Sequence, residues 1–261
     1  MKLYRVNALL LKYFYISKNR IDRIFDILYW PLIDIFIWGF ASYYIYSLSN
    51  INILSIIFSA VILWVFVWRG SQDIAVFILE DYWSKNLYHL FSSPVKISEH
   101  ITSILIFGFL RGIASFLVMS LVAFLFYKFN IFVIPILLLG ISVFILSIFG
   151  WIMGLLVTSF IFRFGQRIQV LAWSIVWIIQ PFSCVFYPFS ALPTWAANIA
   201  QFLPPMYVFE NLRAYLQHGT IQYSGILKAF GIEMVMLIGV LFFLGYSFKA
   251  AKRKGLLAKA D

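Results

Sequence analysis

Charged side chains are scarce in this sequence. Asp, Glu, Lys and Arg make up 11% of its 261 residues, whereas 63% are hydrophobic and the mean hydropathy is +0.94. A soluble domain of this length needs far more polar surface than this to cover its core. The composition therefore excludes a soluble globular protein and predicts a chain embedded in a lipid bilayer.

Residues that carry catalysis or bind metals are also few. The one cysteine, Cys184, lies in an apolar run, so we expect a buried thiol and no internal disulfide. The three histidines, His89, His100 and His218, lack the H-E-x-x-H spacing of zinc sites. Neither a G-x-S-x-G nucleophile motif nor a G-x-x-x-x-G-K-S/T phosphate-binding loop occurs. We therefore expect a chain that is not an enzyme and that binds no metal or cofactor itself.

Long apolar runs dominate what is present. A helix needs about 20 mostly apolar residues to cross a bilayer, and six runs approach or exceed this length. These runs cover residues 24–46, 51–68, 101–127, 134–162, 168–187 and 226–248. No internal repeat or soluble linker separates them. The sequence therefore predicts an all-α polytopic membrane protein with six transmembrane helices, forming a single membrane domain over residues 1–261.

The basic residues orient these six runs. Sixteen Lys and Arg residues lie before the first run, after the second, after the fourth or after the last. Only Lys128, Arg213 and Lys228 lie in the alternate connections, and Arg111 lies within a run. The positive-inside rule therefore predicts that both termini are cytoplasmic, in the inner (plasma) membrane. The basic residues form no stripe with interleaved aromatics, so no nucleic-acid partner is expected despite the net charge of +10.

Residues 1–23 precede the first run and are too basic for a cleavable signal peptide. Lys2, Arg5 and Lys12 alternate with apolar residues at helical spacing. This pattern predicts an amphipathic helix in contact with membrane lipid at the cytoplasmic surface, and a frayed basic leader is the alternative.

Residues 69–100 are expected to form a cytoplasmic loop. Within it, residues 80–91 show helical apolar spacing, begin with Glu80 and Asp81, and are followed by Ser93 and Pro94. Acidic residues favour a helix N-terminus, and proline disfavours helix in the residue before it. The predicted short helix either connects two spans or offers a docking surface to a soluble partner.

Residues 188–225 are expected on the external side of the membrane. Four prolines divide this segment, and residues 191–202 and 207–217 each predict a short apolar helix. Helices below spanning length either dip into the outer leaflet as re-entrant helices or cap the bundle.

Two of these segments carry motifs that resemble a known family. The cytoplasmic motif comprises Glu80, Asp81, Trp83, Leu87, Leu90, Phe91, Ser93 and Pro94. The external motif comprises Tyr187, Pro188, Leu192, Pro193, Trp195, Pro204, Pro205, Glu210 and Arg213. Together with the topology, they resemble the permease subunits of type 2 ABC exporters, which include drug, polysaccharide and lipid exporters.

The resemblance implies partners and a mechanism. Such a permease pairs with a second permease copy, identical or related, and with ABC ATP-binding subunits that hold ATP and Mg. Residues 80–91 would be the coupling helix that docks on the ATPase, and the cargo would be an amphipathic drug, lipid or glycan. An ion-coupled secondary transporter, or a membrane targeting or assembly factor without transport, are the alternatives. The first predicts helices broken at mid-membrane and repeated halves, and the second leaves the proline-rich external segment unexplained.

Three ionisable residues are predicted inside spans, where charge is costly: Asp34, Arg111 and Glu233. Asp34 and Arg111 have opposite charges, so we expect them to form a structural ion pair, with a proton relay as the alternative. Glu233 either lines a translocation path or faces Lys228. The glycine pairs 108/112 and 150/154 indicate close helix packing.

Overall fold

The computed structural model describes residues 1–49, 53–86, 90 and 92–253, and this part of the chain is helical without strands. Its main helices are α1 (Leu3–Lys18), α2 (Ile21–Ser49), α3 (Leu54–Trp83), α5 (Ile97–Tyr127), α6 (Ile136–Phe164), α7 (Leu171–Ile179), α8 (Thr194–Ala200), α9 (Pro204–His218) and α10 (Tyr223–Arg253). Short 3-10 turns connect some of them: η1 (Ile131–Val133), η2 (Gly165–Ile168), η3 (Gln180–Ser183) and η4 (Phe189–Ala191). The all-α prediction is confirmed.

Among the described residues, five helices are long and apolar enough to cross a membrane: Phe25–Leu48, Leu54–Trp83, Ile97–Tyr127, Ile136–Ile168 and Tyr223–Arg253. They match five of the six predicted runs and make the chain a multi-pass membrane protein by length and composition. The remaining run, residues 168–187, contains the shorter apolar helix Leu171–Ser183. At 1.5 Å per residue this helix is about 20 Å long, less than the hydrocarbon thickness of roughly 30 Å.

The shortness of this segment has a local cause. Pro181 lies in the first turn of η3, where it lacks the N–H that would continue the α-helix. Cys184 then adopts a left-handed backbone conformation, with φ of 54°. A residue in this conformation ends a right-handed helix, because its backbone angles lie outside the right-handed α region.

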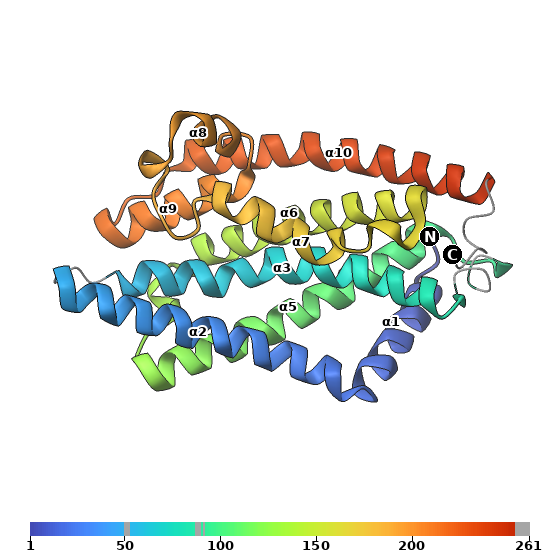
Figure 1. Cartoon of the computed structure of the whole chain (residues 1–261), viewed down its shortest axis with the longest axis horizontal. Helices are drawn as coiled ribbons and strands as arrows, with labels where there is room; N and C mark the ends of the chain where they lie inside the picture. Colours follow the sequence, from blue (N-terminus) through green and yellow to red (C-terminus); the bar gives the residue numbers. More distant parts are fainter. Residues whose placement is uncertain (50–52, 87–89, 91, 254–261) are drawn as a thin grey trace.

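The helices run along the long axis of the molecule in alternating directions (Figure 1). The start of α1, the end of α3, the turn between α6 and α7 and the end of α10 lie at one end of the bundle, which we call the α1 end. The short helices α8 and α9 lie at the opposite end, which we call the α9 end. Helix α7 runs from the α1 end towards the α9 end, so it returns the chain to the side from which α10 starts.

Helix α3 is the centre of the packing. It contacts α2, α5, α6, α7 and α9, and most of its side chains are buried. A Cβ added to Gly150 of α6 would lie 2.8 Å from the carbonyl oxygen of Phe66, and one added to Gly154 would lie 2.8 Å from that of Ser71. The glycines therefore allow α6 to approach the α3 backbone closely, as predicted for small-residue pairs.

Helix α3 also corrects the predicted boundaries of the cytoplasmic loop. Residues 69–83 belong to α3, so the connection between α3 and α5 shrinks to residues 84–96. Glu80 and Asp81 consequently lie in the last turn of α3 and not at the start of a separate helix. The charges at Arg69 and Asp73 suggested a loop, yet both side chains are buried among partners from other helices.

Candidate functional site

A cluster of four charged side chains, three of them buried, joins α2, α3 and α5. The guanidinium of Arg111 lies 2.5 Å from Oδ1 of Asp73 and 3.0 Å from Oδ2 of Asp26. Arg69 lies 2.5 Å from the same Oδ2 of Asp26. Asp73, Arg69 and Arg111 are at most 4% exposed. Two cations and two anions therefore neutralise one another where an isolated charge would be very costly.

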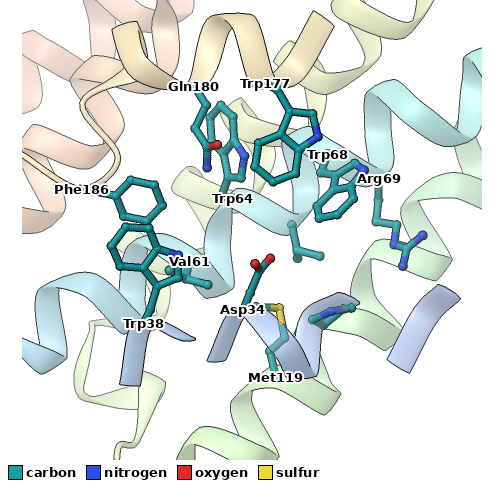
Figure 2. A pocket seen from close by; sticks show the side chains of 12 residues that line it. Asp34, Trp38, Val61, Trp64, Trp68, Arg69, Met119, Trp177, Gln180 and Phe186 are labelled. Carbon is teal, nitrogen blue, oxygen red and sulfur yellow. The ribbon is translucent and has the colours of Figure 1, made fainter. Parts of the chain in front are cut away.

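The expected pair between Asp34 and Arg111 is wrong. Arg111 binds Asp73 and Asp26, whereas Asp34 points into a separate pocket beside Trp64 and Trp38 (Figure 2). Sequence reasoning missed Asp73 because it was assigned to a loop. The spacing of Arg69 and Asp73, four residues apart, was the available signal, since it places both on one helix face.

The acidic pair at the end of α3 is bound by the N-terminal helices. Glu80 accepts hydrogen bonds from Arg20 and Arg23, which lie at the α1–α2 junction. Asp81 accepts one from Nζ of Lys12 in α1 at 2.6 Å. The two carboxylates therefore fasten α1 and the start of α2 to the last turn of α3.

Tyr13 completes this contact from the buried face of α1. Its hydroxyl lies 3.1 Å from Nδ1 of His100 and 3.4 Å from Oδ2 of Asp81. Burial and the nearby Asp81 carboxylate raise the pKa of Tyr13, so its hydroxyl stays protonated and donates. Together with the Lys12 contact, this forms what we call the α1 latch: Lys12, Tyr13, Asp81 and His100.

The predicted N-terminal helix exists, and one of its sides packs against the protein. Val6, Leu9 and Tyr13 pack against the protein, whereas Leu3 and Phe14 are 74% and 54% exposed. Arg5 turns towards Glu99 and the carbonyl of Pro94 instead of pointing away from the protein. The helix thus has a protein-facing side and an exposed apolar side, which suits the surface of a bilayer.

The end of α3 and the residues after it contain the predicted apolar face. Trp83, the last residue of α3, is 45% exposed. Leu90 packs partly against the core, and the hydroxyl of Ser93 donates to its carbonyl at 2.5 Å. Leu87 and Phe91 of the same predicted apolar face lie outside the described residues.

At the α9 end, two residues of the external motif, Glu210 and Arg213, contact each other and the chain that follows η3. Oε1 of Glu210 accepts a hydrogen bond from the backbone N–H of Phe189 at 2.9 Å and also binds Arg213. Arg213, only 7% exposed, donates to the carbonyl of Cys184 at 3.1 Å. These contacts join the chain after η3 to α9, across 21 and 29 residues of sequence.

The other residues of the external motif shape the backbone near the contact between Glu210 and Arg213, which we call the Glu210–Arg213 lock. Pro193 caps α8 in an extended conformation, and Pro204 and Pro205 begin α9, where missing N–H groups need no partner. The hydroxyl of Tyr187 donates to the carbonyl of Pro181. Leu192 and Pro188 lie on either side of η4, and Trp195 is 63% exposed.

Glu233 is fully buried where α10 packs on α6. Lys228 is exposed, and the described residues show no ion pair between these two side chains. The expectation that Glu233 faces Lys228 is therefore wrong for this structure.

No protein-family model matches the chain, and a search of curated proteins finds no relative.

Proposed function

We propose that this chain is the permease subunit of an ATP-driven exporter of the type 2 ABC class, moving an amphipathic drug, lipid or glycan across the inner (plasma) membrane. The observation that carries the proposal is the lock formed by Glu210 and Arg213. Both residues belong to the external motif, and they join α9 to the chain that follows η3. The short helices α8 and α9 lie at the α9 end, opposite the end of α3 (Figure 1).

We propose six membrane crossings, with α7 and η3 as the fifth. The start of α1 and the end of α10 lie at the same end of the bundle, an arrangement that an even number of crossings explains (Figure 1). In this topology both termini are cytoplasmic, and α8 and α9 are re-entrant helices in the outer leaflet. Cys184 and Val185, which follow η3, are buried, and η3 contacts α8 and α9. Irregular backbone is tolerated at membrane depth where protein surrounds it in this way.

The charge cluster gives no support to an ion-coupled carrier, because Arg69 and Arg111 are matched by Asp26 and Asp73. A chain without a phosphate-binding loop must take its energy from a partner. We therefore place the ATP, the Mg and their hydrolysis on a separate ABC ATP-binding subunit, and we propose a second permease copy across the transport path.

We propose that the partner subunit docks at the end of α3. Trp83 is exposed there, while neighbouring Asp81 and Glu80 bind α1 and α2. A push on this end would therefore reach α1, α2 and α3 together. Rocking of two such copies would open and close the path between them.

The test is affinity purification of the chain from its native membrane, with identification of any P-loop ATPase that co-purifies. Trp83→Ala should weaken recovery of the ATPase about 30-fold, the loss expected when a hot-spot aromatic worth about 2 kcal/mol is removed. Trp195→Ala is the matched control, because Trp195 is similarly exposed at the opposite end. Full recovery with Trp83→Ala would contradict the docking site, and no recovery with the unaltered chain would contradict the exporter.

A further inference from the structure

A small pocket of about 70 Å³ lies inside the bundle between α2, α3, α5 and the α7–η3 segment. Its walls are mostly aromatic, and among the described residues Asp34 is the one carboxylate that lines it (Figure 2). The aromatic residues of the wall are Trp38, Trp64, Trp68, Trp177 and Phe186. This pocket is separate from the charge cluster described above, although Arg69 lies at its edge.

Asp34 lacks a partner in this pocket. Within the described part of the chain, its carboxylate makes no hydrogen bond or ion pair, and it points into the space between the rings. Arg69, the cation nearest to the pocket wall, is already bound to the carboxylate of Asp26 at 2.5 Å. The pocket therefore contains one acidic group whose charge the protein itself does not balance.

The aromatic rings are held in place by one another. Trp38 stacks on Phe186 with ring centroids 3.8 Å apart, and Trp68 meets Trp177 edge to face at 5.5 Å. These four residues lie in α2, α3 and α7 and in the segment between η3 and η4. The wall is therefore formed by the fold and not by one flexible segment. Tryptophan is the side chain whose ring face attracts a cation most strongly.

We propose that this pocket binds a small methylated ammonium ion. A cation balances Asp34 and gains from the tryptophan rings, whereas an anion would be repelled by the carboxylate. Methyl groups suit the apolar wall, which offers too few acceptors for the N–H groups of an unmethylated ammonium ion. A pocket of about 70 Å³ suits a small ion such as tetramethylammonium and is too small for a drug-sized molecule.

This proposal does not depend on the exporter function, because binding is measured on the full chain without an ATPase. The experiment titrates the chain in lipid nanodiscs with tetramethylammonium chloride at constant ionic strength, following tryptophan fluorescence and binding heat. tert-Butanol, an uncharged molecule of similar shape, is titrated in parallel. We expect saturable binding of the cation and binding of tert-butanol that is weaker by about tenfold or more.

Variants locate the bound ion. Asp34→Asn should weaken cation binding about tenfold or more, and so should Trp177→Leu. Trp177 is 53% exposed, so its substitution is expected to leave the fold intact even if Asp34→Asn does not fold. Trp173→Leu is the matched control, because Trp173 lies on the same helix and outside this pocket, and cation binding should be unchanged.

Three results would overturn the proposal. The first is absence of cation binding to the unaltered chain. The second is equally strong binding of tert-butanol, which would show an apolar cavity without charge selectivity. The third is unchanged cation binding in both Asp34→Asn and Trp177→Leu. Loss in those two variants with retention in Trp173→Leu would support the site.

Discussion

At the scale of single residues, the buried charges of this protein divide into matched and unmatched groups. Asp26, Asp73, Arg69 and Arg111 neutralise one another within the bundle. Asp34 faces a pocket without a partner among the described residues. A matched group stabilises the fold only as long as every member is present, since removing one leaves a buried charge uncompensated.

The matched cluster predicts a strong and reversible mutational effect. Asp73→Asn should destabilise the chain by about 3–5 kcal/mol, because Arg69 and Arg111 would then share the single carboxylate of Asp26. Adding Arg111→Gln should recover part of this loss. The measurement is thermal unfolding in detergent together with the yield of folded protein.

The control replaces the residue that sequence reasoning paired with Arg111. Asp34→Asn combined with Arg111→Gln should give effects that add, because these side chains do not meet. Recovery in this second double variant, or its absence in the first, would contradict the assignment of partners.

At the scale of helices, α3 is held by close backbone approach on one side and by charge on the other. Glycines of α6 allow the carbonyls of α3 to come near, while α5 and α2 contribute Arg111 and Asp26. At its end, the α1 latch and Arg23 fasten α1 and α2 to the same helix. Movement of α3 along its axis would therefore disturb every one of these contacts.

The close approach of α6 and α3 predicts a position-specific effect of one methyl group. Gly150→Ala should destabilise the bundle by about 1–3 kcal/mol, because the new Cβ would lie 2.8 Å from the carbonyls of Phe66 and Val67. Gly140→Ala is the control on the same helix, where no atom lies within 4 Å of the added Cβ. Thermal unfolding of both variants in the same detergent tests this, and equal effects would refute the packing argument.

At the scale of the whole molecule, the distribution of basic residues and the path of the chain agree. The start of α1, the α6–α7 turn and the end of α10 lie at the α1 end (Figure 1). Most Lys and Arg residues lie in or beside these parts of the sequence, including Arg163 near the α6–α7 turn. Arg69 is an exception, since it belongs to the buried cluster and not to a cytoplasmic loop. Without Arg69, the distribution of the other basic residues still predicts the same orientation.

The topology predicts the outcome of reporter fusions. Fusions after Lys128 and Gln217 should report the external side, because few basic residues precede or follow these connections. Fusions after Asn86 and Lys259 should report the cytoplasm. Alkaline phosphatase and fluorescent-protein reporters, active on opposite sides, provide the paired readout. An external signal after Lys259 would contradict six crossings and favour five.

Much of the helical layout followed from composition and spacing alone. Apolar runs located α2, α5, α6 and α10, because a long stretch without charge has no stable place other than lipid or a protein core. The basic spacing of the first residues likewise predicted α1. The length of α3 was missed, because hydropathy counts Arg69 and Asp73 as polar whether or not they are paired.

The sequence by itself determined that this chain is an all-α membrane protein, since hydrophobic composition requires burial whatever the packing. It also placed Glu210 and Arg213 in one motif, although only the fold brought them to Phe189 and Cys184. Tertiary structure alone decided that Arg111 binds Asp73 and that Asp34 faces tryptophan rings. The choice of partner depends on how each helix is rotated and where helices cross, and these are set by contacts between residues far apart in the chain.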